Sequence, residues 1–328
     1  MGYQNNILIR TSLGDEGVIG KRKFSYQSPD MIAHTQVENP DEYFKGNYDK
    51  DVNMALDKNS GTNFVYVRGK NKAAGGVATN GYVWLYCCGS SLFMKPSLWS
   101  SKKVYTADGE SCAFVSSDVQ NDIVVINKPF LLNALNNQYF CMVVIVTDEK
   151  RECIPENFAS YDQFNYWVRT NIGVAVRNFN VVKGKTIYDF QRLDTLSNPS
   201  DKEEPAMIKV SWTGLPDGYT VGVKCDAIPD LGKSVKSSEK VRSLATAAMI
   251  PAGFDGYVET FAYNDDGKAG FPENAQIDTD FLTSVSFNQK CYQFGKTLQE
   301  LGLEPAEHIG LTETSKLVLT GECSTIFV

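Results

Sequence analysis

Alternation of side chains with a period of two residues runs through this chain and restricts it to folds built from β-strands. The segment 81–87 places three aromatic rings on one face and Val83, Leu85 and Cys87 on the other. Because both faces are apolar, this strand is expected at the centre of a sheet that is covered on both sides. The segment 63–68 has a similar β-branched and aromatic pattern, and a Gly- and Ala-rich stretch joins the two. We expect them to pair as adjacent antiparallel strands.

Further segments of the same kind follow along the chain. The turn Leu215-Pro216-Asp217-Gly218 makes 207–213 and 219–225 a predicted hairpin. Short helices are expected at 161–169, where Ser160 and Gln163 form a capping-box pattern, and at 292–301. The remaining expected strands are 6–11, 122–127, 139–147, 172–182, 256–263, 281–287 and 316–320 or beyond.

The apolar rhythm is interrupted most clearly at 196–205, where Ser, Asn, Pro and charged residues replace it. At about 100–200 residues per domain, a chain of 328 residues is long enough for two domains. Since 42% of the residues are hydrophobic, both can bury a core. We predict an all-β fold with an N-terminal β-sandwich with insertions at 1–195, a linker at 196–205 and a second β-sandwich at 206–328.

Five segments occur in the order NFVYVRGKN (63–71), YVWLYCC (82–88), PSLW (96–99), NKPFLLNALNNQYFCMVVIV (127–146) and NIGVAVRNFNVV (171–182). Together they resemble an immunoglobulin-like β-sandwich module that is attached to bacterial secreted, toxin-associated and protease proteins. The resemblance covers residues 27–183, and the stretch from Cys153 to Trp167 departs from the compact pattern. It implies that this N-terminal sandwich is immunoglobulin-like and serves in binding or as a spacer, and we expect both sandwiches to be immunoglobulin-like. It carries no catalytic residue.

The charge balance bears on partners. A net charge of −7 and a pI near 5.1 disfavour nucleic acid, which needs an excess of Lys and Arg facing phosphates. The basic cluster Lys21-Arg22-Lys23 is expected to form a solvated turn. No secretory signal peptide is visible, so we expect cytoplasmic synthesis, with release that needs no signal as an open alternative. The apolar stretch 139–146 is too short to cross a membrane as a helix.

Residues that carry chemistry are few. No zinc-site spacing, phosphate-binding loop or nucleophile elbow occurs, and we expect no cofactor. The eight cysteines include no Cys-x-x-Cys pair and are expected to be reduced core residues. A Cys–His hydrolase using His34 or His308 stays open, because such partners meet in space rather than in sequence. Asp265 and Asp266 are candidate calcium ligands, although their Asn-Asp-Asp-Gly segment is more typical of a hairpin turn.

Aromatic side chains are the remaining candidates for a binding site. We expect Trp84 and Trp212 in the core. An exposed aromatic row on a sandwich face can stack on sugars or anchor a protein partner. The candidate binding residues are Trp99, Tyr166, Trp167, Tyr257 and Tyr263.

The sequence therefore predicts a non-enzymatic protein that acts through its surfaces. Self-assembly into a homo-oligomer, particle or inclusion is the first expectation, because the edges of two sandwiches must be covered or paired. The alternative is an effector or toxin component that binds a target-cell protein or glycan, and the third hypothesis is the Cys–His hydrolase. Exposed coplanar aromatic rings would favour glycan binding. Buried aromatics and a large symmetric interface would favour assembly.

Overall fold

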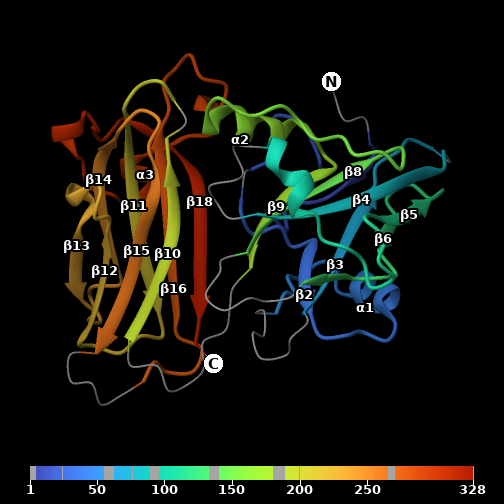
Figure 1. Ribbon diagram of the computed structural model, residues 1–328, viewed down its shortest axis with the longest axis horizontal. Coiled ribbons are helices and arrows are strands. Elements are labelled where there is room, and N and C mark those ends of the chain that lie inside the picture. The colour runs from blue at the N-terminus through green and yellow to red at the C-terminus, as the bar shows by residue number, and fades with distance from the viewer. Residues whose placement is uncertain are drawn as a thin grey trace. The chain divides into compact units, whose positions relative to one another are not determined.

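The computed structural model describes residues 5–23, 25–54, 63–75, 77–88, 96–132, 140–179, 189–198, 200–264 and 270–327 (Figure 1). The chain divides into two compact units. Unit 1 consists of Met1–Phe158 and Phe164–Phe179, and unit 2 of Ala159–Gln163 and Asn180–Val328. Antiparallel sheets make up both units, and the helices are short. The all-β fold class is confirmed.

Unit 1 contains two sheets. In the first, β3 (Asn63–Asn71) is the central strand and pairs with β1 (Ile7–Leu8), β2 (Met31–His34), β6 (Ile123–Val125) and β7 (Phe130–Leu132). The second has the order β5-β4-β8-β9, with β5 at Ala113–Ser117, β4 at Thr79–Cys88, β8 at Phe140–Thr147 and β9 at Val174–Phe179. The helices of this part of the chain are α1 (Pro40–Gly46), the 3-10 helix η2 (Pro96–Lys102) and α2 (Tyr161–Thr170).

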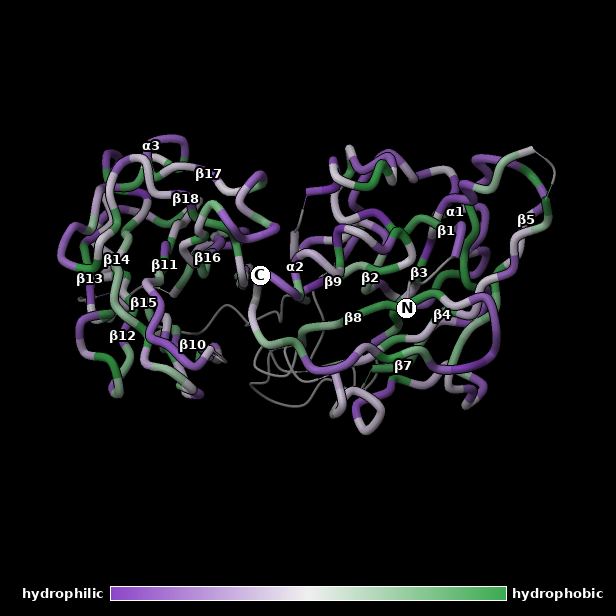
Figure 2. Tube along the Cα trace, turned by 90° about the horizontal axis from the view of Figure 1, so that it is seen from above, coloured by the Kyte–Doolittle hydropathy of each residue, from purple (hydrophilic) through white to green (hydrophobic). Residues whose placement is uncertain are grey.

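The sequence explains why these strands are internal. In β8, every residue from Cys141 to Val146 is fully buried, and the trace is apolar along most of the strand (Figure 2). A strand buried on both faces needs cover on both sides. Next to β3, α1 begins with Pro40 in its first turn and buries Phe44 against Ile32 and Tyr66. The helix thus covers one face of the first sheet.

Unit 2 also contains two sheets. One has the order β10-β15-β12-β13, and the other has the order β14-β11-β16-β18-β17. Their strands are β10 (Asp189–Ser197), β11 (Glu204–Thr213), β12 (Tyr219–Lys224), β13 (Lys233–Lys236), β14 (Ser243–Ile250), β15 (Asp255–Asn264), β16 (Gln276–Ser284), β17 (Lys296–Thr297) and β18 (Lys316–Ile326). Short helical turns lie at η3 (Pro229–Leu231), η4 (Tyr292–Phe294), α3 (Leu298–Leu301) and η5 (Glu307–Ile309).

The second sheet of unit 2 is apolar on both faces. One face carries Ile208, Val210 and Trp212 of β11, all buried. The opposite face carries Met207 and Leu282, which pack with Leu298 of α3 in a separate hydrophobic cluster. The segment that contains α3 therefore acts as a cover for this sheet.

The four central strands of unit 2 pair as in an immunoglobulin domain. There, strand B lies beside E and strand C beside F; here β11 lies beside β14, and β12 beside β15. The outer strands are exchanged. The first strand, β10, pairs with β15, where the last strand of an immunoglobulin domain would lie, and β16 takes the place of the first strand beside β11.

Two predicted strand pairs are wrong. The strand at 63–71 lies in the first sheet of unit 1, whereas the strand at 79–88 lies in the second. In unit 2, β11 and β12 likewise belong to different sheets. In both cases the connection crosses from one sheet to the other instead of forming a hairpin. The expected central position of 81–87 is confirmed, since β4 lies between β5 and β8.

The structure also divides the chain earlier than the predicted linker at 196–205. Strand β10 belongs to unit 2, where it pairs with β15 from Asp189 to Ser197. The segment 196–205 contains the end of β10 and the start of β11, so it connects two strands of one unit. Its polar composition is that of a loop that connects the two sheets of unit 2.

The two predicted helices have different outcomes. The helix at 161–169 is confirmed as α2, and the Ser160 hydroxyl accepts a hydrogen bond from the backbone N–H of Gln163 at 3.3 Å. The expected helix at 292–301 is wrong, since that segment contains η4, β17 and the single-turn α3. Gly295 lies in the middle of it, and glycine weakens helices. Among the described residues, no helix has the length and apolar character needed to cross a membrane.

Candidate functional site

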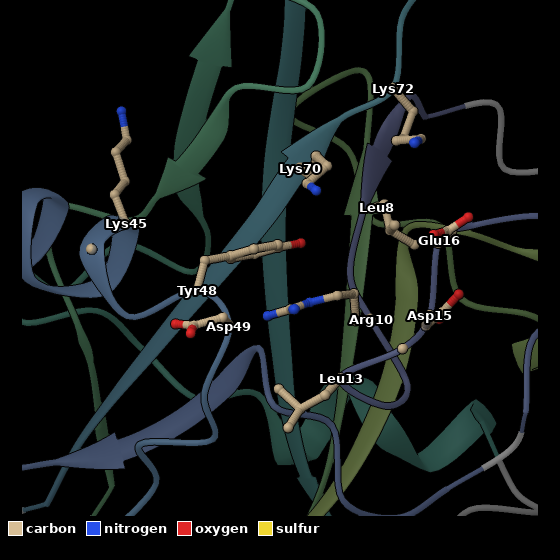
Figure 3. Close-up of a pocket in the computed structure, with 12 residues that line it drawn as sticks. Leu8, Arg10, Leu13, Asp15, Glu16, Lys45, Tyr48, Asp49, Lys70 and Lys72 are labelled. Carbon is tan, nitrogen blue, oxygen red and sulfur yellow. The ribbon is translucent and has the colours of Figure 1, made fainter.

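Unit 1 contains an open cavity of about 660 Å³, which we call the Tyr48 pocket (Figure 3). Its lining comes from β1 and the loop that follows it, from the end of α1 and from β3. The cationic side chains in the lining are Arg10, Lys45, Lys70 and Lys72. Acidic side chains of Asp15, Glu16 and Asp49 also line it. Such a cavity suits a small polar ligand or head group.

A buried carboxylate fixes the floor of the Tyr48 pocket. Asp30 is fully buried and pairs with two arginines, Arg10 and Arg68. Its Oδ1 lies 2.6 Å from Arg10 Nη2 and 3.0 Å from Arg68 Nε. One carboxylate thus pairs with two guanidinium groups, and buried charges of this kind require such pairing.

Arg68 connects Asp30 to the end of α1 through hydrogen bonds. Its Nη1 donates to the backbone carbonyls of Phe44 and Asn47, and its Nη2 to those of Pro29 and Lys50. A guanidinium has five N–H donors in a fixed plane, so it can hold several carbonyls at once. These hydrogen bonds hold the turn that carries Tyr48 in place.

Tyr48 lies between cations. The guanidinium carbon of Arg10 lies 3.4 Å from the centre of the Tyr48 ring, and Lys70 Nζ lies 5.0 Å from it (Figure 3). Both distances are within the range of cation–π interactions. The Tyr48 hydroxyl is screened from solvent and has no hydrogen-bond partner in the described part of the chain. Burial raises the pKa of Tyr48 far above its ordinary value, so the hydroxyl remains a donor at neutral pH.

A second buried ion pair shapes the loop beside the pocket. Asp15 pairs with Arg22 at 2.9 Å, and both side chains are buried. Asp15 also accepts hydrogen bonds from the backbone N–H groups of Thr11 and Gly17. The prediction of a solvated turn at 21–23 is wrong for Arg22, although Lys21 and Lys23 are exposed.

The other candidate surface lies on unit 2. The outer face of the β10-β15-β12-β13 sheet carries Leu193, Tyr257, Phe261 and Tyr263, which we call the aromatic strip. Tyr257 is 64% exposed, Leu193 60% and Tyr263 39%. These are three of the four large apolar side chains that are exposed in the described part of unit 2, the other being Phe287. Because these side chains are concentrated on one face, they form an apolar patch, unlike apolar side chains that are exposed singly.

The geometry of the aromatic strip is set by a glycine. Gly222 lies opposite Phe261 in the register of β12 and β15. A Cβ atom at Gly222 would lie 2.2 Å from the tip of the Phe261 ring, so only glycine leaves room for the ring. Phe261 and Tyr263 are nearly parallel, with 14° between their planes and 6.2 Å between their centres. An ion pair between Lys224 and Glu259 lies on the same face at 3.3 Å.

The predicted binding residues have different environments. Trp99 is fully buried and contacts Tyr86 and Trp167, so it is a core residue rather than a surface one. Trp167 is half-buried beside Phe164, whereas Tyr166 is exposed on α2. Tyr257 and Tyr263 lie together on the aromatic strip. Asp265 and Asp266 lie outside the described residues. The core positions expected for Trp84 and Trp212 are confirmed, with exposures of 4% and 1%.

The geometry required by a Cys–His hydrolase is not formed by the described residues. His34 lies near Tyr43 and Phe44, and His308 is exposed. Burial raises the pKa of Cys87 to about 12, and it raises the pKa of Cys112 and Cys323 as well. A catalytic thiol needs the opposite shift. The seven cysteines with described side chains form no disulfide. Among all the residues that the structure describes, no cluster of three or more His, Cys, Asp or Glu side chains could hold a metal ion.

Sequence reasoning missed the Tyr48 pocket. Its residues come from positions 8–16, 45–49 and 70–72, and nothing in those segments alone shows that they meet. One signal was present: Arg68 directly follows the apolar run 64–67, and an arginine inside a buried strand requires an acidic partner.

Comparisons with known proteins add nothing to what the structure itself shows. No protein-family model and no curated protein matches the chain. Among solved structures, the calcium binding domain CBD12 of CALX1.1 has 7% sequence identity and a TM-score of 0.21, and the match covers 82% of this chain and 94% of that one. CfaE, the adhesive subunit of CFA/I fimbria of enterotoxigenic Escherichia coli, has 8% identity and a TM-score of 0.21, with coverage of 99% and 88%. Likeness at this level assigns no function.

Proposed function

We propose that this chain is a non-enzymatic binding protein that recognises glycans through the aromatic strip of unit 2. The observation that carries the proposal is the pair of nearly parallel rings, Phe261 and Tyr263, on a solvent-facing sheet. Sugars present flat C–H faces that stack on such rings. Pairs of aromatic rings gain about 0.5–1.5 kcal/mol beyond the buried area, and we take this as the scale for a sugar stacked on one ring.

The strip also has the length and polarity that a saccharide chain needs. Tyr257 and Tyr263 are six residues apart on one strand, which corresponds to about 20 Å. Lys224 and Glu259 beside them offer a donor and an acceptor for sugar hydroxyls. A binding role of this kind fits the expectation of a component that recognises a target-cell glycan after release.

The test is a screen of the full chain on an array of oligosaccharides, followed by titration calorimetry with the tightest binder. We expect Tyr257→Ala and Tyr263→Ala each to weaken binding about tenfold. Tyr105→Ala is the matched control, because Tyr105 is 53% exposed but lies in unit 1. Absence of any glycan binding by the unchanged chain would contradict the proposal.

Self-association through the same strip is the competing interpretation. Light scattering across a concentration series distinguishes the two. A monomer at every concentration is expected for a glycan-binding face. A discrete multimer that Tyr257→Ala or Tyr263→Ala converts to monomers would show that a second copy covers the strip, and the glycan proposal would be wrong.

A further inference from the structure

The loop at 11–22 in unit 1, which lines the Tyr48 pocket with residues 13–16, exposes apolar side chains. Leu13 and Val18 are each 48% exposed, and Ile19 is 63% exposed. Leu13 lines the pocket directly, and a Cβ at Gly17 would lie 3.2 Å from the side chain of Leu8, another lining residue. The buried ion pair of Asp15 and Arg22 joins two points of this loop, so the backbone between them, which carries Val18 and Ile19, is fixed at both ends.

Lysines without a carboxylate partner lie at the end of this loop and in the lining of the pocket. Lys21 and Lys23 are exposed at the end of the loop. Within the described residues, Lys70 forms no ion pair, and Lys72 reaches only the side-chain oxygen of Asn121, at 3.5 Å. The other cations of the pocket are already paired, Arg10 with Asp30 and Lys45 with Asp41.

The charge that remains for a ligand is therefore positive. Counted over the loop, the residue that follows it and the pocket lining together, four exposed or lining lysines without an ion pair in the described residues (Lys21, Lys23, Lys70 and Lys72) outnumber the two exposed acids, Glu16 and Asp49. In a chain of net charge −7, such a patch orients the molecule toward an anionic surface. Lys70 Nζ lies 5.0 Å from the centre of the Tyr48 ring, so the ring and the unpaired lysine belong to the same pocket.

We propose that the Tyr48 pocket and the loop at 11–22 together dock on a bilayer that contains anionic phospholipids. Lys70 and Lys72 take the phosphate of one head group, while Leu13, Val18 and Ile19 enter the boundary between head groups and acyl chains. Apolar residues that enter this boundary beside lysines that attract anionic lipids are the usual basis of reversible membrane binding. A soluble phosphate ester would use the lysines but would leave the exposed apolar tips without a role, so we favour the lipid.

The experiment is co-sedimentation of the full chain with phosphatidylcholine vesicles, with and without about one third phosphatidylserine. We expect binding only to the vesicles that contain phosphatidylserine, and we expect it to weaken as salt is raised. Lys70→Gln with Lys72→Gln should weaken partitioning about 25-fold, since each lysine near an anionic surface contributes about a factor of five. Val18→Ser with Ile19→Ser should weaken it at least about tenfold.

Two controls separate this proposal from its alternatives. Lys128→Gln removes an exposed lysine of unit 1 outside the pocket, and Tyr257→Ala alters the glycan-binding strip; neither should change vesicle binding. Far-UV circular dichroism confirms that each variant is folded. Equal binding to both vesicle types, or no binding, would overturn the proposal. Binding of inorganic phosphate that needs Lys70 and Lys72, without vesicle binding, would assign the pocket to a soluble ligand instead.

Discussion

The substitution Asp30→Asn tests whether the buried ion pairs organise unit 1. It keeps the shape of the side chain but removes the one negative charge shared by Arg10 and Arg68. Asp30 accepts hydrogen bonds from the backbone and guanidinium of Arg10 and from Arg68, at 2.6–3.2 Å. Both guanidinium groups would remain buried, since Arg10 is 4% and Arg68 0% exposed.

The expected cost follows from that geometry. Removing one partner of a buried ion pair costs about 3–5 kcal/mol, and here two cations lose the same partner. A loss of about 4 kcal/mol is a large part of the 5–15 kcal/mol that stabilises a typical domain. The free energy of unfolding falls by about 2 kcal/mol for each molar of urea, so the urea concentration at the unfolding midpoint of unit 1 should fall by about 2 M.

Hydrogen exchange of the full chain in graded urea measures the two units separately. Peptides from β3 and β4 should lose protection at lower urea in the variant, while peptides from unit 2 keep theirs. Asp41→Asn is the matched control, because Asp41 forms an exposed ion pair with Lys45. It should shift the midpoint by no more than about 0.25 M. An equally small shift for Asp30→Asn would refute the view that this carboxylate is essential for unit 1.

Three further predictions concern single positions. Burial raises the pKa of Asp280 to about 6, so the stability of unit 2 should fall as pH rises from about 4 to 6, where the unfolded chain ionises first. Asp280→Asn should reduce this fall, which hydrogen exchange of unit 2 peptides in graded urea measures across this pH range. Tyr48→Phe removes a hydroxyl without a partner, so calorimetry should show an unfolding temperature that is unchanged or higher. Gly222→Ala should destabilise unit 2 by about 1–3 kcal/mol, and combining it with Phe261→Ala should restore most of that loss in a double-mutant cycle.

The strands could be predicted from the sequence, but their partners could not. Alternation shows which side chains share a face, and this was enough to locate the segments at 63–68, 81–87 and 207–213, which lie within β3, β4 and β11. It does not show which strand lies beside which. Both predicted pairs failed because the chain crosses between sheets at points where a glycine-containing turn also permits a hairpin.

The candidate sites were predictable to the extent that they lie within one strand. Tyr257 and Tyr263 share a face because their separation is even, so their placement together followed from the period of two. Trp99 is buried although its segment has no strand pattern, because rings from η2 and α2 meet in the core. The charged framework of unit 1 joins residues as distant as Arg22 and the carbonyl of Val168, 146 positions apart. No local pattern reports such a contact.

The placement of β10 has a consequence for proteolysis. A protease that cuts the loop between β10 and β11 would separate the chain covalently while leaving β10 in its sheet, paired with β15 along nine residues. The two fragments should migrate apart on a denaturing gel yet elute as one species from a gel-filtration column. The same strand makes a fragment that begins at residue 206 incomplete, because β15 would present an open edge ready to pair with a neighbouring molecule. Unit 2 is therefore a case of intrinsic strand complementation, in which the segment leaving unit 1 completes the next fold.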